Sequence, residues 1–154
     1  MKVKLGDKFP NFELKDHDGN LFVLYDENKI SFRVLYFYPK DETPGCTKQA
    51  CYFRDFYEDF KKYECEIFGI SNDTKKSHEN FKENYKLPFK LLTDYKGKLR
   101  KRLDLPKDFF GLSPGRVTFL LNDEHEILFI FRSALNMKSH ITSVLDFLKK
   151  NKTN

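Results

Sequence analysis

Two of the three cysteines of this chain, Cys46 and Cys51, lie five positions apart in the stretch YPKDETPGCTKQAC. The apolar run ISFRVLYFY precedes them, and apolar residues at helical spacing follow them. This pattern predicts a strand, a short turn that contains Pro44 and Gly45, and a helix that starts at Cys46. A helix N-terminus favours a thiolate, because its free N–H groups and its dipole attract negative charge. Cys46 is therefore placed as a nucleophile, and a buried thiol at a helix start is the alternative.

The second cysteine argues against a purely structural disulfide. Five residues of intact helix separate two Cα atoms by about 8.6 Å, whereas a disulfide needs a Cα separation below about 7 Å. The sulfurs of Cys46 and Cys51 cannot bond while this helix is intact, but unwinding its first turn would bring them within reach. This relation favours a catalytic pair, in which Cys46 is oxidised in the folded form and Cys51 captures it after local unfolding.

Zinc binding is the competing use of clustered cysteines, and the sequence does not favour it. The third thiol, Cys65, falls inside a predicted buried strand, where we expect a small apolar core residue. The histidines show no H-x₃₋₅-H spacing; they are His17, His78, His125 and His140. The cysteine pair also lacks the C-x-x-C spacing of a general dithiol reductase. We therefore expect no metal site.

Length and composition restrict the class of protein. With 154 residues the chain can bury a sizeable core, and we expect one domain over residues 1–154. Charged residues make up 33% of the chain, and no apolar run approaches the roughly 18–20 residues of a membrane span. These properties exclude an integral membrane protein.

The expected compartment follows from the N-terminus and the cysteine count. The N-terminal stretch MKVKLGDKFPNFELKD has no apolar core of the secretory type and is not rich in Arg and Ser, so we expect no signal or transit peptide. Three cysteines leave one unpaired, which suits a reducing compartment. The cytosol is the default expectation, and an organelle such as a plastid or mitochondrion is the alternative if a transit peptide has been removed.

The basic residues are spread along the chain, apart from one dense cluster. The formal net charge is +5, and the cluster is KGKLRKRLDLPK at residues 96–107. We expect it to be a solvated helix face, with binding to nucleic acid or to an acidic partner as the alternative.

Hydrophobic periodicity predicts the elements that position the cysteines. Strands are expected at 12–15 and 21–24 around an Asp-Gly turn, at 30–38, at 65–71, at 91–94, and in the hairpin of RVTFLLND with HEILFIFR. Helices are expected from Cys46 to about residue 60, after the caps at 72–74 to about Tyr85, at 97–103, and from near Asn136. The order of these elements predicts a thioredoxin-like α/β fold, with an N-terminal β-hairpin and a central mixed sheet flanked by helices.

The stretch around Cys46 resembles the active site of a known family. Its residues Pro39-Lys-Asp-Glu-Thr43-Pro-Gly-Cys46 match the Pro-x-x-x-Thr-x-x-Cys signature of peroxiredoxins. The longer string YFYPKDETPGCTKQACYFRD is similar to the peroxiredoxin Q branch, also called bacterioferritin comigratory protein, which typically carries a second cysteine five positions on. The resemblance continues through FGISND, YKLPFKLLTD and FGLSPGRVTFLL and covers about residues 5–148.

The resemblance implies a thiol peroxidase that reduces hydrogen peroxide and organic hydroperoxides in antioxidant defence. It implies that Cys46 is the peroxidatic cysteine and Cys51 the resolving one, and that their intrachain disulfide is recycled by a thioredoxin or a similar dithiol. Thr43 corresponds to the hydroxyl that hydrogen-bonds thiolate and peroxide, Pro39 to the residue that shields the pocket, and Arg116 to the active-site arginine. No metal, haem or flavin is needed. A monomer is expected, as is common in this branch, and a dimer through the active-site edge is the alternative.

Two other functions stay open on the sequence alone. A redox sensor or relay that passes its disulfide to a partner protein would use the same cysteines, and only turnover with a reductant separates it from a peroxidase. A binding module that uses residues 96–107 would bind nucleic acid or heparin in a salt-dependent way. We expect neither nucleic acid nor a membrane among the partners.

Overall fold

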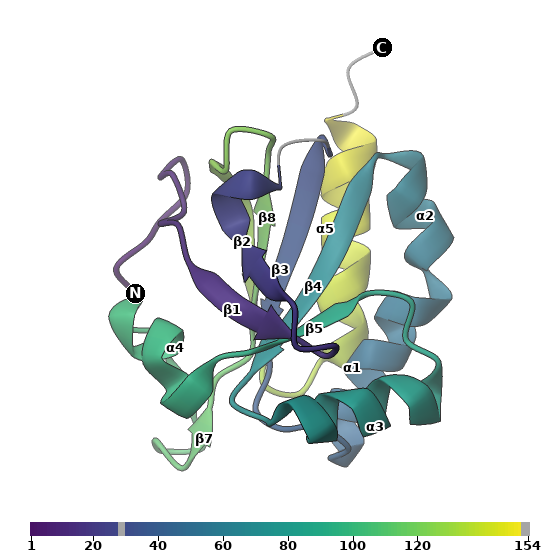
Figure 1. The fold of residues 1–154 in the computed structure, drawn as a ribbon. Helices are drawn as coiled ribbons and strands as arrows, with labels where there is room; N and C mark the ends of the chain where they lie inside the picture. The colour runs from purple at the N-terminus through teal and green to yellow at the C-terminus, as the bar shows by residue number, and fades with distance from the viewer. Residues whose placement is uncertain (28–29, 152–154) are drawn as a thin grey trace.

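The computed structural model describes residues 1–27 and 30–151, which form a central twisted sheet with helices packed around it (Figure 1). The sheet order is β2-β1-β5-β4-β3-β8-β9. The strands are β1 (Glu13–Asp16), β2 (Leu21–Val23), β3 (Phe32–Phe37), β4 (Cys65–Ser71), β5 (Lys90–Thr93), β8 (Val117–Leu121) and β9 (Ile127–Arg132). The central strands β3, β4 and β5 are parallel, and the remaining pairs are antiparallel. The predicted mixed sheet and N-terminal hairpin are confirmed.

Helices cover both faces of this sheet. They are α1 (Pro44–Asp55), α2 (Tyr57–Lys62), α3 (Lys75–Tyr85), α4 (Lys98–Arg102) and α5 (Met137–Lys150), with 3₁₀ turns η1 (Leu24–Asp26) and η2 (Tyr95–Gly97). In Figure 1, α1, α2 and α5 lie to the right of the sheet, α3 crosses its lower end, and α4 lies on the left. The described helices include none that is long and apolar enough to cross a membrane.

Side chains cap α3, where a cap was expected, and α5, which begins where a helix start was expected. The side chain of Thr74 accepts a hydrogen bond from the N–H of Ser77, and that of Asn136 accepts one from the N–H of Ser139. Each cap satisfies a backbone donor that has no partner within its own helix. The two helix starts predicted from residues 72–74 and Asn136 are confirmed.

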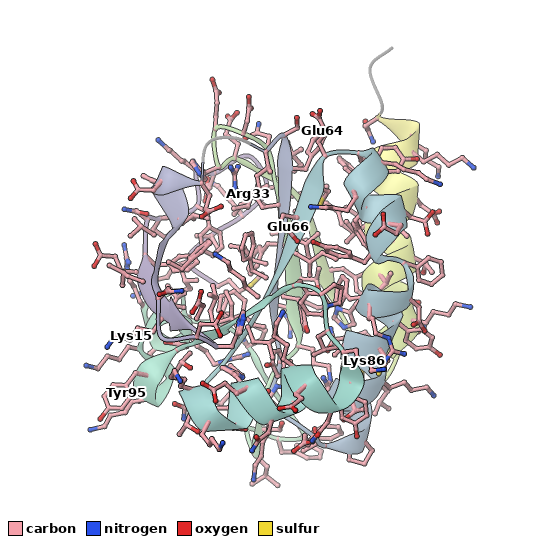
Figure 2. All side chains as sticks on the ribbon, turned by 45° about the vertical axis from the view of Figure 1, so that its right-hand side comes forward. Lys15, Arg33, Glu64, Glu66, Lys86 and Tyr95 are labelled. Atoms are coloured by element: carbon pink, nitrogen blue, oxygen red, sulfur yellow. The ribbon has the colours of Figure 1, made fainter. Side chains whose placement is uncertain are left out.

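Two apolar clusters fill the two faces of the sheet, and β3 contributes to both. Val34 and Tyr36 belong to the cluster beneath α1, α2, α3 and α5. Leu35 and Phe37 belong to the cluster formed with α4 and the N-terminal segment. Successive strand residues point to opposite faces, so a strand covered on both faces is apolar along most of its length. Arg33, labelled in Figure 2, is the one charged residue of β3 and is buried.

The structure corrects the prediction of one helix from Cys46 to about residue 60. The helix breaks at Phe56, whose backbone angles are φ −100° and ψ 9°, and α2 starts at Tyr57. The rings of Phe53 and Phe60, on either side of this break, lie in one buried cluster with their centroids 5.9 Å apart. The hydrophobic spacing continues through the break and therefore does not indicate where the first helix ends.

The segment between α4 and β8 also differs from the prediction. A short hairpin of β6 (Lys107–Asp108) and β7 (Ser113–Pro114) was not expected, because two-residue strands that contain proline leave no periodic signal. The basic cluster at residues 96–107 is only partly a helix face. Lys98, Lys101 and Arg102 are exposed on α4, but Arg100 is turned into the protein.

Candidate active site

Cys46 is buried in the first turn of α1, as its sequence context predicts. Thr43 precedes the helix in an extended conformation, and Pro44 occupies the first helical position. Proline suits this position, because its missing N–H would have no partner within the helix and its fixed φ matches the helix. The chain enters the helix directly from the end of β3, through residues 38–43. The thiol therefore lies beyond the carboxyl end of the central strand β3, close to the N-terminus of α1.

Arg116 contacts the Cys46 sulfur directly. Its Nη1 donates a hydrogen bond to Cys46 Sγ over 3.1 Å and a second one to Gln49 Oε1 over 2.9 Å. All three side chains are buried. Gln49 lies one helical turn beyond Cys46, so one face of α1 presents both the thiol and the acceptor that orients the guanidinium. Gln49 was missed in the sequence, where only its three-residue spacing from Cys46 points to it.

Gly45 lets the guanidinium lie against the helix start. A Cβ atom at Gly45 would lie 2.8 Å from Arg116 Nη2 and 3.1 Å from Met137 Cε. The first of these distances is too short for a real contact, so a larger residue would displace Arg116. The requirement for glycine here is the close approach of this side chain.

The segment that carries Arg116 is supported by a second, half-buried arginine. Arg100 donates from Nη2 to the carbonyl oxygen of Gly115 over 2.7 Å and from Nη1 to that of Pro106 over 3.3 Å. Burial lowers the pKa of Arg100 to about 10, which keeps it charged at neutral pH. On the other side, the N–H of Arg116 donates to Asp108 Oδ2 over 3.4 Å. Nothing in the sequence separates Arg100 from the exposed cations around it, so its role was also missed.

Thr43 and Pro39 lie on the loop that leads into α1. The Thr43 hydroxyl donates to the carbonyl oxygen of Lys40 over 2.9 Å. Its proton is committed to that bond, while its oxygen can still accept another hydrogen bond. Pro39 lines a cavity of about 370 Å³ together with Arg100 and Pro114. Neither Cys46 nor Arg116 lines this cavity.

The three cysteines carry free thiols in different environments. Cys51 is half-buried on α1, which is continuous between it and Cys46. Burial raises the pKa of the Cys51 thiol, and the nearby Asp55 adds to this effect while Arg54 opposes it. Cys65 is buried at the start of β4, and burial raises the pKa of its thiol far more strongly. Cys65 thus occupies the core position that was expected of it.

A set of possible metal ligands lies near the site. Among the described residues, Asp41, Asp73 and His78 have ligand atoms within 4.8 Å of one another. These groups already bond to neighbouring protein groups: His78 contacts Asp41 with Nδ1 and the carbonyl oxygen of Leu92 with Nε2, and Asp73 accepts from Ser71. All three side chains therefore already have hydrogen-bond partners within the protein.

A sheet that presents a thiol at the start of a helix, at the end of a central strand, is the framework of thiol-based redox enzymes. Residues 5–130 match the model of the AhpC/TSA family. The chain belongs to this family. It is 47% identical over 150 residues to a protein of Oryza sativa subsp. japonica named peroxiredoxin Q, chloroplastic, and covers 68% of that protein. The protein of the same name in Arabidopsis thaliana is 47% identical over 148 residues, with the same coverage of 68%. Each alignment spans 96% of the present chain.

A solved structure agrees with this assignment. The fold is similar to that of peroxidoxin BcpB from Mycobacterium tuberculosis, with a TM-score of 0.89 and 30% sequence identity. The match covers 98% of this chain and 99% of that one. The resemblance to the peroxiredoxin Q branch and the predicted thioredoxin-like fold are confirmed, and the chain is a thiol-dependent peroxidase.

Proposed function

We propose that Cys46 is the thiol that reacts with hydroperoxide and that Arg116 assists this reaction. The observation that carries the proposal is the hydrogen bond of 3.1 Å from Arg116 Nη1 to the buried Cys46 sulfur. The thiolate attacks the nearer peroxide oxygen, so that an S–O bond forms while the O–O bond breaks. The sulfur is oxidised to a sulfenic acid. The leaving oxygen takes up a proton and departs as an alcohol, or as water when the substrate is hydrogen peroxide.

The charge on Arg116 suits this displacement. Negative charge passes from the sulfur to the leaving oxygen during the reaction. A guanidinium that is always charged and offers several donors in one plane can stabilise both atoms. The acceptor on Gln49 fixes the orientation of that plane before the peroxide arrives. Donors fixed in advance around a developing charge accelerate a reaction, because they do not have to reorganise.

The loop before α1 supplies the remaining contacts in this proposal. Because the Thr43 hydroxyl donates to Lys40, its oxygen is free to accept the O–H of the hydroperoxide. This hydrogen bond orients the peroxide for attack by Cys46. Pro39 shields the reacting atoms from bulk water.

We assign Cys51 as the resolving cysteine. Its sulfur attacks the sulfenic sulfur of Cys46, a disulfide forms, and the hydroxyl group leaves as water. The helix must open first, because an intact helix holds the two Cα atoms about 8.6 Å apart. Opening also exposes Cys51 and removes the burial that raises its pKa. The same movement therefore brings the second thiol closer and makes it more reactive.

An external dithiol of the thioredoxin type returns the disulfide to two thiols by exchange. Because both cysteines lie in one helix, a single chain completes the cycle, and we propose a monomer that needs neither nucleic acid nor a membrane. We propose the cytosol as its location, with an organelle as the alternative. The plant relatives are named as chloroplastic proteins.

Turnover with thioredoxin, thioredoxin reductase and NADPH tests this cycle. The wild type should oxidise many equivalents of NADPH per chain when hydroperoxide is added. Cys46→Ser should give none, and the matched variant Cys65→Ala should retain turnover, because its thiol lies outside the cycle. If the wild type is oxidised once and is not reduced again by thioredoxin or by a small dithiol, the cycle is wrong and a disulfide relay takes its place.

A further inference from the structure

His78, on α3, is completely buried and pairs with a carboxylate of the active-site loop. Its Nδ1 lies 2.7 Å from Asp41 Oδ2, and its Nε2 lies 3.1 Å from the carbonyl oxygen of Leu92. A carbonyl oxygen only accepts hydrogen bonds, so Nε2 carries a proton. The short contact on the other side of the ring needs a second proton, held between Nδ1 and the carboxylate. The pair therefore links the loop before α1 to α3 and β5 through charge-assisted hydrogen bonds.

The Asp41 side chain collects further hydrogen bonds in the interior. The Tyr38 hydroxyl donates to Oδ1 over 2.6 Å, and the Ser77 hydroxyl donates to Oδ2 over 2.9 Å. The backbone N–H of Asp41 donates to Asp73 Oδ2 over 2.8 Å. Such bonds are strong in a buried setting, and removing one partner leaves a buried polar group unsatisfied. Through these hydrogen bonds, Asp41 anchors the active-site loop to the rest of the protein.

The residue that follows Asp41 is held in an unfavourable conformation. Glu42 has φ 60°, in the left-handed region that costs energy for a residue with a Cβ atom. Its carboxylate accepts a hydrogen bond from Asn84 Nδ2 on α3 over 2.6 Å. A strained turn persists only when its surroundings hold it in place. Contacts from α3 therefore hold the turn that decides where α1 begins and where Cys46 is placed.

We propose that Asp41 and His78 form a clamp on the active-site loop, and that this clamp sets the relative populations of two conformations of the segment around Cys46. In the closed conformation the helix is intact and the sulfur lies beside Arg116. In the open conformation the first turn is unwound and Cys51 can reach the sulfur. This inference rests on the proposed roles of the two cysteines. Neither Asp41 nor His78 touches the sulfur, so both are positioning residues.

The clamp has a consequence that a purely structural pair would not have. Weakening it lowers the population of the closed conformation, so the reaction with peroxide slows. The same weakening raises the population of the open conformation, so disulfide formation accelerates. If the pair only stabilised the fold, weakening it would lower the free energy of unfolding and leave both rates unchanged in the folded protein.

The two steps can be measured separately by quenched flow, with alkylation and mass spectrometry. Oxidation of Cys46 to the sulfenic acid by hydrogen peroxide is followed in a Cys51→Ser background, and disulfide formation is followed with both cysteines present. We expect Asp41→Ala and His78→Ala to accelerate the second step by at least about tenfold, because charge-assisted bonds that hold the closed conformation are lost. The first step should slow by the factor by which the closed population falls.

Two further variants act as controls. His125→Ala removes another buried histidine, which contacts the carbonyl oxygen of Leu24 away from the loop, and should change neither rate. Asp41→Asn keeps the shape and offers an N–H to a neutral His78 Nδ1. This variant should restore both rates to within about threefold of the wild type, because hydrogen bonds survive without the charge.

Amide hydrogen exchange of the reduced protein tests the clamp without peroxide. Amides of residues 40–47 should exchange at least about tenfold faster in Asp41→Ala and His78→Ala than in the wild type or His125→Ala. Unchanged exchange in this segment, or two rates that move in the same direction, would overturn the clamp. If the wild-type thiol does not react with peroxide at all, the proposed function fails, and the exchange result still decides whether the clamp exists.

Discussion

Arg116 and Cys46 are 70 residues apart in the chain, yet Nη1 and Sγ are 3.1 Å apart. Strand register brings them together, because Phe37 at the end of β3 pairs with Val117 at the start of β8. Cys46 follows the first of these strands after a short loop, and Arg116 immediately precedes the second. The contact therefore depends on the pairing of β3 with β8 at two buried positions.

Arg116→Lys should lower the rate constant for oxidation by hydrogen peroxide about 100-fold. A lysine keeps the charge but lacks the planar set of donors that contacts sulfur and Gln49 together, and losing one fixed donor to a developing charge costs about this factor. Stopped-flow or competition kinetics with the reduced protein measure the constant. Arg132→Lys, an exposed arginine on β9, is the matched control and should react like the wild type. A rate within threefold of the wild type for Arg116→Lys would contradict the role given to the guanidinium.

Gly45→Ala should lower the same rate constant about tenfold while the protein stays folded. The added Cβ would lie 2.8 Å from Arg116 Nη2, so the guanidinium must move away from its position against the helix, and a displacement of this size can cost one to two orders of magnitude in rate. Circular dichroism checks the fold, and peroxide kinetics check the rate. Lys48→Ala, an exposed change on the same helix, should leave the rate unchanged. Equal rates in both variants would show that the close approach at Gly45 is not needed.

Alkylation of the reduced protein should separate Cys51 from Cys65. Only the thiolate is alkylated, and burial raises the pKa of both thiols. At pH 7, iodoacetamide should label Cys51 more slowly than an ordinary surface cysteine, and labelling should accelerate as the pH rises above the usual value of about 8.5. Cys65 should be labelled only after denaturation in urea. Peptide mass mapping measures both, and rapid labelling of Cys65 in the native protein would contradict its place in the core.

His140 should make the protein less stable in mild acid. It is completely buried, accepts from the Thr118 hydroxyl at Nδ1 over 2.8 Å and donates from Nε2 to the carbonyl oxygen of Ser133 over 2.8 Å. Burial lowers its pKa, and the nearby Arg116 lowers it further, while the bond to Ser133 opposes this. The unfolded chain takes up a proton at about pH 6.5, before the folded protein does, so the free energy of unfolding falls as the pH drops below that value.

Urea unfolding of the wild type and His140→Gln at pH 7.5 and pH 5.5 measures this effect. His17 and His125 also have a pKa lowered by burial, so the wild type should lose stability through all three groups. The variant should lose about 1 kcal/mol less than the wild type between the two pH values, which corresponds to most of one titrating group. An equal loss in both proteins would show that His140 is not the group responsible.

Much of the fold could be predicted from the sequence, because hydrophobic periodicity is a local property. β4 spans Cys65–Ser71, the range expected for it, and the two expected hairpins are present. The break at Phe56 could not be predicted, because the apolar spacing of a helix continues through it. The hairpin of β6 and β7 could not be predicted either, since it is held by backbone contacts between short polar segments.

The candidate site could also be predicted only in part from the sequence. The spacing around Cys46 and the resemblance to peroxiredoxins pointed to Arg116, and the structure places the two in contact. Gln49, Arg100 and His78 were missed as supports of the site, because each acts through a partner that is distant in the sequence or on another turn of the helix. The residue type alone does not show whether an arginine or a histidine is buried or exposed, because burial is decided by tertiary packing.

The most direct test of the proposed roles of Cys46 and Cys51 is the stoichiometry of peroxide consumption without any reductant. Reduced wild type, Cys46→Ser and Cys51→Ser are each given a limiting dose of hydrogen peroxide and then mapped by non-reducing peptide mass spectrometry. We predict that the wild type consumes about one peroxide per chain and joins Cys46 to Cys51, that Cys46→Ser is inert, and that Cys51→Ser stops at the sulfenic acid or a higher oxide. Peroxide left untouched by the wild type, or a disulfide that contains Cys65, would contradict these roles.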